Sequence, residues 1–295
     1  MLLRPLQAVI VLALLGASPA AADDPPCPGL FAEGRAPVLT NPKLAAHTRP
    51  LCFEAYAVLH SGASRTPLYA AEHLTRESVA AARMVARDDS FHEEERLPAA
   101  ERSQLEDYVH SGFDRGHLAP AGDMPTPEAQ AQSFSLANIV PQNRAFNRGL
   151  WSGIEESVRR LASQRGTLYV VTGAVFTGGV VDALKSRVLV PTQLYKALYD
   201  PASGEAGAYL APNRGGGEWR AVSMDELRAV AGVDVFPGLP AAAKARAMDL
   251  PEPREFARGD AAERRPRSDT WQDWFFRELA RAVSKALRDV LRSIF

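Results

Sequence analysis

The chain has 295 residues, of which 46% are hydrophobic and 23% charged, and its formal net charge is −1. This length suits one large domain, or one domain with an appendage, and the apolar content is ample for a core. The near-zero net charge excludes the overall basic balance that many nucleic-acid binders show, so any positively charged groove must be local.

The first 22 residues have the pattern of a secretory signal peptide. One positive charge at Arg4 precedes an apolar run over residues 8–15 and small residues over 20–22, which is the order of a leader that is removed on export. The apolar run is too short to cross the roughly 30 Å of a bilayer core, and an uncleaved anchor is the alternative. We expect cleavage after Ala22 and a periplasmic or secreted protein.

Cys27 and Cys52 are the two cysteines of the chain. Export would place them in an oxidising compartment, so we expect one disulfide that pins the start of the mature chain to the first core strand. Closing a loop of this length contributes about 3 kcal/mol in the chain-entropy model. The alternative is two unpaired thiols.

The first half of the chain predicts an irregular arm followed by paired strands. Residues 23–50 are rich in Pro and Gly and indicate the arm. Aromatic and branched residues predict strands over 53–59 and 68–74, joined by a turn at 61–64. A partly helical segment over 78–87 and a polar loop over 88–107 follow.

The clearest helix is predicted over residues 147–163, where apolar residues recur at steps of three and four. Gly166 would end it. Asn147, Trp151 and Glu155 are spaced four residues apart, which places them on one face of a regular helix. A buried strand is predicted over 168–172, and strands over 188–190, 194–199 and 207–210 are expected to continue the same sheet. Ser223 and Glu226 match a helix-capping box.

Changes in composition predict five segments. They are a signal peptide (1–22), the arm (23–50), a main domain (51–251), a Pro- and Arg-rich linker (252–268) and an amphipathic helix (269–295). Three interpretations of the last helix stay open. It could dock on the body or on a second subunit to form a homodimer, make a peripheral membrane contact through residues 270–295, or be a disordered end.

The tetrapeptide Asp114-Arg115-Gly116-His117 carries groups that could cleave a phosphodiester. A neutral histidine can accept a proton from water near pH 7, an arginine presents a planar fork to phosphate, and a divalent metal can shield the phosphoryl oxygens. Gly116 is either an ordinary turn residue or one that lets the phosphate come close. A lone histidine is more often structural, so the interpretation depends on residues further along the chain.

Three ordered motifs resemble those of the DNA/RNA non-specific endonuclease family, the endonuclease G-like nucleases with a ββα-metal site. They lie at residues 111–120, which contain the tetrapeptide, at 138–142, and at 147–151 followed by Glu155. Looser similarity extends the resemblance over residues 50–250 or so. It implies an α+β fold with a central, mostly antiparallel sheet flanked by helices.

The resemblance implies that His117 is the general base and that Asn147 is the one direct protein ligand of a Mg²⁺ ion, for which Mn²⁺ could substitute. Glu155 would hold the ion through water, which fits the reluctance of magnesium to dehydrate. From the residues alone, Asn147 could instead be only a helix N-cap, and Glu155 an exposed helix acid.

Three further residues receive roles from the same resemblance. Arg115 would bind or orient the phosphate, and Asn138 would orient His117 or support the transition state. The family also uses an upstream arginine, for which Arg87 is the first candidate and Arg83 the second, because the spacing is not kept in this loop.

The resemblance thus implies an exported, magnesium-dependent endonuclease that hydrolyses DNA and RNA to oligonucleotides with 5′-phosphate ends. Contacts to phosphate instead of base edges would explain a lack of sequence preference. The alternative is a non-catalytic module that binds nucleic acid or a partner on a nuclease-like scaffold.

Overall fold

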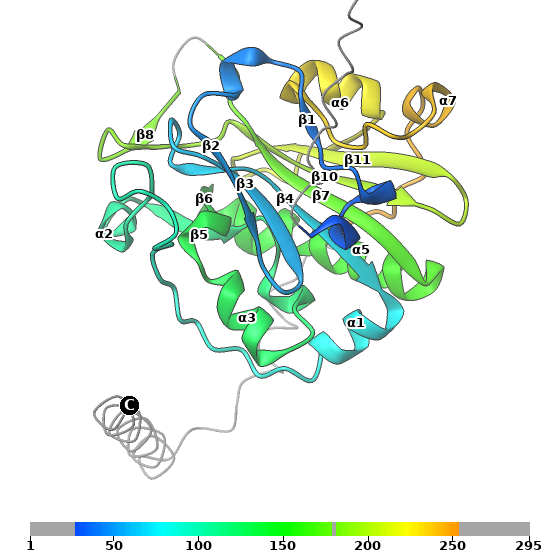
Figure 1. Cartoon of the computed structure of the whole chain (residues 1–295), viewed down its shortest axis with the longest axis horizontal. Coiled ribbons are helices and arrows are strands. Elements are labelled where there is room, and N and C mark those ends of the chain that lie inside the picture. Colours follow the sequence, from blue (N-terminus) through cyan, green and yellow to red (C-terminus); the bar gives the residue numbers. More distant parts are fainter. Residues whose placement is uncertain (1–26, 179–180, 254–295) are drawn as a thin grey trace, which may run out of the picture.

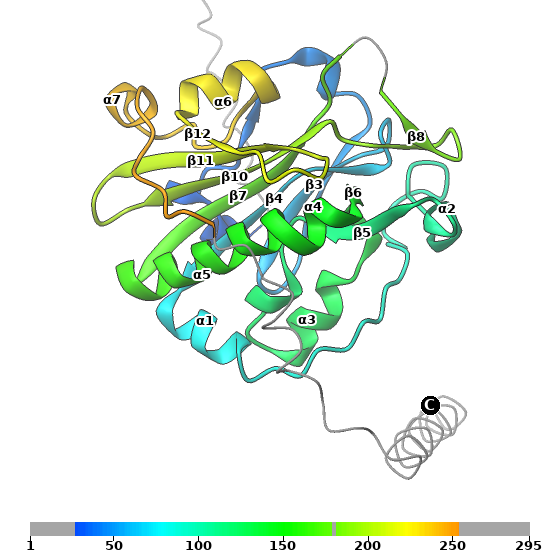
Figure 2. The ribbon, with the colours of Figure 1, turned by 180° about the vertical axis from the view of Figure 1, so that it is seen from behind.

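The computed structural model describes residues 27–178 and 181–253. Its centre is a seven-stranded antiparallel sheet with the strand order β12-β11-β10-β7-β4-β3-β2 (Figures 1 and 2). The strands are β2 (Thr48–Cys52), β3 (Tyr56–Ser61), β4 (Thr66–Thr75), β7 (Thr167–Val175), β10 (Gln193–Asp200), β11 (Glu205–Pro212) and β12 (Arg220–Val222).

Helices cover both sides of this sheet. They are α1 (Arg76–Ala82), α2 (Leu105–Tyr108), α3 (Pro127–Ser133), α4 (Arg144–Phe146), α5 (Ser152–Arg165), α6 (Met224–Ala231) and α7 (Ala241–Lys244). Figures 1 and 2 place α1, α3 and α5 on one side of the sheet and α6 and α7 on the other. The predicted α+β class with a central antiparallel sheet is confirmed. Within the described residues, none of these helices has the length and apolarity that a membrane span requires.

Alternation along the strands divides the core into two apolar clusters. Successive side chains of a strand point to opposite faces of a sheet: Val170 packs in one cluster with Ile154 of α5, and Val171 packs in the other with Leu227 of α6. We call these two sides of the sheet the α5 face and the α6 face.

A small hairpin lies beside the main sheet on the side of α5. Strand β5 (Phe113–His117) pairs antiparallel with β6 (Ile139–Asn143). Asn143 then caps α4, because its Oδ1 accepts hydrogen bonds from the backbone N–H groups of Ala145 and Phe146. The hairpin and the helices after it form the ββα unit that the resemblance implies.

The predicted helix over 147–163 is present, but it begins earlier and is not regular. It starts with α4, passes through a π-helical turn (Asn147–Trp151), and continues as α5 to Arg165, where Gly166 ends it with φ 94°. Within the π turn, Gly149 has φ −112° and ψ −106°. The N-cap of the whole helix is therefore Asn143 and not Asn147.

Two other predictions about strands are wrong. The strand predicted over 188–190 does not join the main sheet, because β9 (Val188–Leu189) pairs only with β8 (Ala183–Leu184). The predicted irregular arm also contains regular structure. Strand β1 (Val38–Leu39) pairs with β13 (Val233–Asp234), and β2 forms an edge of the main sheet.

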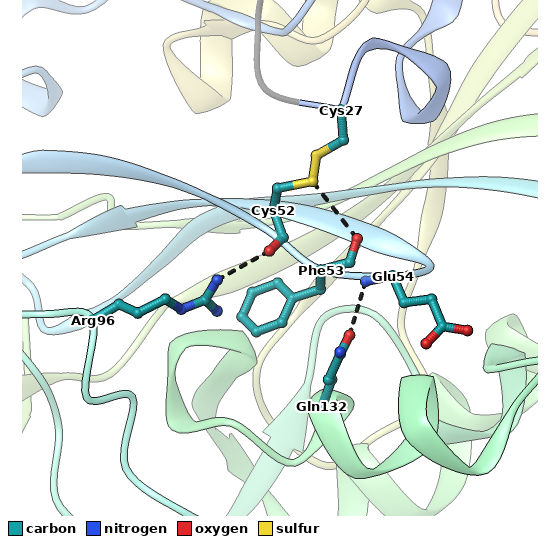
Figure 3. Close-up of a disulfide and its surroundings, with 6 residues drawn as sticks. All are labelled: Cys27, Cys52, Phe53, Glu54, Arg96 and Gln132. Atoms are coloured by element: carbon teal, nitrogen blue, oxygen red, sulfur yellow. Dashed lines mark hydrogen bonds between the residues drawn. A yellow bond between two sulfur atoms is a disulfide. The ribbon is translucent and has the colours of Figure 1, made fainter.

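The predicted disulfide between Cys27 and Cys52 is confirmed, with the two Cα atoms 6.1 Å apart (Figure 3). It ties the start of the described chain to the end of β2. Around this point Arg96 donates a hydrogen bond to the carbonyl of Cys52 (3.0 Å), and the N–H of Glu54 donates to Oε1 of Gln132 (2.8 Å). The end of β2 is therefore held both by the disulfide and by hydrogen bonds from side chains.

Three predicted segments lie wholly or almost wholly outside the described residues. They are the signal peptide (1–22), the linker (252–268), of which the structure describes only two residues, and the amphipathic helix (269–295).

Candidate active site

A cleft of about 410 Å³ lies between the end of β5 and the helix formed by the π turn and α5. Five of the residues predicted from the sequence line it: Arg87, Arg115, His117, Asn147 and Glu155. The structure therefore brings together side chains from the loop after α1, from the hairpin and from the helix.

His117 is the last residue of β5, and its ring is held by aromatic neighbours. The ring centroid lies 5.4 Å from that of Phe91 and 4.9 Å from that of Phe134. Its Nε2 is buried and has no hydrogen-bond partner among the described residues. Burial, together with the positive charges of Arg87 and Arg115, lowers the pKa of His117 to about 3. The imidazole is thus neutral at pH 7 and has a nitrogen that can accept a proton.

Gly116 makes room for a neighbouring side chain, and not for the phosphate as one interpretation of the sequence suggested. It pairs with Val140 across the hairpin, and a Cβ at this position would collide with the buried side chain of Gln142. The glycine therefore makes room for Gln142, whose Nε2 lies 3.5 Å from the carbonyl oxygen of His117.

Asp114 braces the hairpin against the helix. Its carboxylate accepts hydrogen bonds from Arg148 (2.8 and 3.0 Å), from Arg144 (3.3 Å) and from Nδ2 of Asn147 (3.2 Å). Although burial opposes the shift, these hydrogen bonds hold the pKa of Asp114 below its usual value. Because the amide nitrogen of Asn147 is bound to Asp114, its Oδ1 is the atom left to contact a cation.

The π turn corrects the prediction that Asn147, Trp151 and Glu155 share one face. Trp151 is fully buried and packs on Phe146, with ring centroids 5.3 Å apart. Ser152, the next residue, lines the cleft with Asn147 and Glu155. A π turn adds one residue to the helical repeat, and such turns are frequent at functional sites.

Glu155 and Arg159 are consecutive cleft residues on α5, one helical turn apart. Burial raises the pKa of the Glu155 carboxyl to about 7, against the opposing positive charges of Lys196 and Arg159. The guanidinium of Arg159 pairs with the buried Asp123 at 2.8 Å. The sequence interpretation missed Arg159, although its i, i+4 spacing from Glu155 was an available signal.

A second missed residue lies beneath the cleft. Lys196 on β10 is 1% exposed, and its Nζ donates hydrogen bonds to Oγ1 of Thr172 (2.6 Å) and to the carbonyl of Leu118 (3.4 Å). It thus links the main sheet to the residue that follows His117. A lysine inside an apolar strand was the signal, since lysine is rarely buried without a specific partner.

Asn138 does not line the cleft. Its buried Nδ2 donates to the carbonyls of Ala119 (2.8 Å) and Ser133 (2.9 Å), and its Oδ1 accepts from the N–H of Ala119 (2.9 Å). The amide is therefore engaged in holding the loop that begins just after His117.

Of the two upstream arginines, Arg87 lies at the site. It lines the cleft, and its guanidinium lies 5.4 Å from the ring centroid of Phe134. Arg83 is the C-cap residue of α1 and does not line the cleft. The geometry favours Arg87.

The donor atoms suit a cation held mostly by water. In residues 27–178 and 181–253, no three His, Cys, Asp or Glu side chains form a group that could hold a metal ion. An ion at Asn147 would have one amide oxygen and the nearby Glu155 carboxylate available. Magnesium keeps several water ligands and needs few protein ligands, so these residues fit it.

Comparisons with known proteins support the same interpretation. The DNA/RNA non-specific endonuclease family model matches residues 37–242. A nuclease of Nostoc sp. is 32% identical over 251 residues, covering 77% of this chain and 90% of its own. Nuclease C1 of Cunninghamella echinulata var. echinulata is 38% identical over 176 residues, covering 55% and 70%.

A vertebrate relative and a solved structure also match. The mitochondrial nuclease EXOG of Danio rerio is 34% identical over 197 residues, and the chain spans only 57% of that protein. Among solved structures, the EndoG/EndoGI complex matches with a TM-score of 0.61 and 27% identity, covering 72% of this chain and 92% of the other.

Proposed function

The chain belongs to the DNA/RNA non-specific endonuclease family, and from this premise we propose that it is an exported, magnesium-dependent endonuclease acting on both DNA and RNA. It hydrolyses phosphodiester bonds and leaves 5′-phosphate ends. The observation that carries this proposal is the cleft in which His117 lies with Asn147, Glu155 and Arg115.

His117 acts as the general base. Arg115 and Arg87 hold the scissile phosphate. Burial is the main cause of the lowered pKa of His117, and the negative charge of the phosphate offsets the smaller contribution of the two arginines. The pKa of the imidazole then rises towards the range in which a base is effective. The imidazole of His117 takes a proton from water as the water oxygen attacks phosphorus. The bond from phosphorus to the 3′ oxygen breaks, and that oxygen takes up a proton from solvent water.

Asn147 and Glu155 form the metal side of the cleft. Asn147 would contact the ion through Oδ1, and Glu155 would hold it through water. When bound, Mg²⁺ (or Mn²⁺ as a substitute) supplies positive charge that shields the phosphoryl oxygens and stabilises the leaving oxygen. Asn138 acts on His117 indirectly, by holding the loop at Ala119.

Export is supported by the pattern of residues 1–22 and by the Cys27–Cys52 disulfide, since disulfides persist in oxidising compartments. The amphipathic helix predicted over residues 269–295 is proposed to tether the enzyme, either as a homodimer or to a membrane surface. Deletion of residues 265–295 tests this. Unchanged oligomer mass together with unchanged membrane partitioning would refute it.

The decisive experiment is digestion of plasmid DNA and RNA by the full chain, with millimolar magnesium or with EDTA. We expect cleavage only with metal, and about 10³-fold slower cleavage for His117→Ala, the range for loss of a general base. His47→Ala is the matched control, because His47 is an exposed histidine that pairs with Glu101 and does not line the cleft. Asn147→Ala should lose metal-dependent activity and keep its circular dichroism spectrum.

The alternative is a binding module without catalysis. It would be supported if the wild-type protein retained both nucleic acids in a binding assay yet left them uncut with either Mg²⁺ or Mn²⁺.

A further inference from the structure

A second hollow, of about 490 Å³, opens from the catalytic cleft. The two share Arg87, Arg115, Asn147 and Arg148, so the hollow continues the cleft directly. We call it the side groove. One wall is formed by apolar and aromatic side chains: Phe91, Leu105, Tyr108, Val109 and Phe113. Its volume is that of a site for a small molecule.

Two residues of the apolar wall are exposed to solvent. Leu105 is 36% exposed and Val109 is 43% exposed. They are two of the four exposed large hydrophobic side chains among the described residues, the others being Val38 and Met84. Two of these four thus lie together beside the cleft, which is where a ligand would cover them.

Charged side chains line the rest of the groove. Four arginines line it against two aspartates, Asp89 and Asp114. Arg115 pairs with no carboxylate among the described residues, and its guanidinium lies 4.1 Å from the ring centroid of Phe91. A ligand that fits must therefore combine a flat apolar face with a negative group.

We propose that the side groove is a subsite for one unpaired nucleobase beside the cleaved phosphate, and that it makes single-stranded DNA or RNA the preferred substrate. This rests on the proposed nuclease function. A nucleotide has both features that the groove requires, because its phosphate suits the arginines and its base can stack on the wall. A base inside a duplex has its faces covered by its neighbours, so it cannot use the wall.

Recognition of this kind needs no particular base. Every nucleobase has a π face, so stacking on apolar or aromatic side chains tolerates any sequence. The subsite is therefore consistent with a nuclease that cuts without sequence preference. It distinguishes single-stranded from double-stranded substrates.

The first test compares matched variants. Leu105→Ser/Val109→Ser removes the exposed part of the wall, and Val38→Ser/Met84→Ser makes the same change at the two exposed sites away from the groove. For the groove variant we expect kcat/KM on a single-stranded oligonucleotide to fall about tenfold, mainly through KM, and on the same duplex by less than about twofold. The control should match wild type on both. Equal losses on the two substrates, or no loss on the single strand, would overturn the subsite.

The second test needs no change to the wild-type enzyme. In single-stranded oligonucleotides with one abasic position, we expect one position next to the cleaved bond to slow cleavage about tenfold. The same abasic position should have no effect on the groove variant. An enzyme indifferent to abasic positions would contradict the proposal.

Binding separates failure of the subsite from failure of the nuclease. Affinity for a fluorescent single-stranded oligonucleotide is measured in EDTA with His117→Ala, with and without the groove substitutions. If wild type cuts neither strand form with Mg²⁺ or Mn²⁺, the proposed function fails. The subsite is still supported by weaker binding of the groove variant, and refuted by equal binding.

Discussion

The α5 face and the α6 face are built from alternate residues of the same strands, yet they bury different chemistry. Three charged side chains are buried in the strands of the main sheet, Glu72, Lys196 and Asp200. By the alternation of side chains along β4 and β10, all three lie on the α5 face. Lys196 lies 5.7 Å from the ring centroid of Trp151, and Asp200 pairs with Arg165 of α5. The α6 face packs apolar and aromatic residues against α6.

This difference indicates which face serves the chemistry. Burying a charge is costly unless it is paired and hydrogen-bonded, and strongly perturbed ionisable groups tend to cluster at functional sites. Neither carboxylate oxygen of Glu72 has a hydrogen-bond partner among the described residues, and burial holds its pKa well above the usual range. We infer that the α6 face chiefly stabilises the fold, whereas the α5 face also positions the cleft.

The largest effect is expected at Lys196. Lys196→Met leaves Oγ1 of Thr172 and the carbonyl of Leu118 without their buried partner, so we expect the free energy of unfolding to fall by about 4 kcal/mol. kcat should also fall, at least tenfold, because the loop after His117 is released. Denaturant titration and steady-state kinetics measure the two effects. Leu198→Met, on the same strand and face, is the control and should change neither by much.

At Leu227, on the α6 face, the two effects should separate. Leu227→Ala leaves a cavity in a fully buried position and should lower the free energy of unfolding by about 3 kcal/mol. kcat at a temperature where the variant is folded should stay within about twofold of wild type, since α6 does not reach the cleft. A large loss of kcat in the folded variant would remove the distinction between the faces.

Removing the disulfide should lower the stability without lowering the activity, as expected for the α6 face. The arm that Cys27 begins packs Phe31 and Ala32 into the α6-face cluster. Cys27→Ser/Cys52→Ser frees a loop with a separation of 25 residues and should lower stability by up to about 3 kcal/mol in the chain-entropy model. Thermal unfolding measures the loss, and nuclease activity at low temperature should not change.

The smallest effect is expected from acid. The pKa of His117 is about 3 in the folded protein and near 6.5 when unfolded, so between these pH values the unfolded state binds a proton that the folded state does not. Stability should therefore fall as the pH decreases through this window, by about 1 to 2 kcal/mol from pH 7 to pH 5. His117→Gln should show a smaller fall by denaturant titration in EDTA. His60, whose pKa burial also lowers, contributes equally to both proteins. Equal pH dependence of the two proteins would place the protonated imidazole in contact with solvent.

The sequence predicts the parts of the fold that have a strong periodic or motif signal. The strands around Tyr69 and Val170, the end of the helix at Gly166, and the meeting of His117 with Asn147 all follow from such patterns. The π turn cannot be predicted in this way. It depends on the backbone angles at Gly149, whereas the apolar spacing around it is that of a regular helix.

The roles of buried polar groups are equally hard to predict. Lys196 donates a hydrogen bond to the carbonyl of Leu118, which is 78 residues away in the sequence. Asn138 donates one to the carbonyl of Ala119, which is 19 residues away. A backbone acceptor has no sequence signature, so such partners emerge only once the strands and loops are placed in three dimensions.

The collision between Gly116 and Gln142 has a consequence for how this site can evolve. Any side chain at position 116 overlaps that of Gln142 across the hairpin, so a single replacement there forces Gln142 to move. The same replacement costs less stability once a smaller residue stands at position 142. Positions 116 and 142 are therefore epistatic, because the effect of a substitution at one depends on the residue at the other.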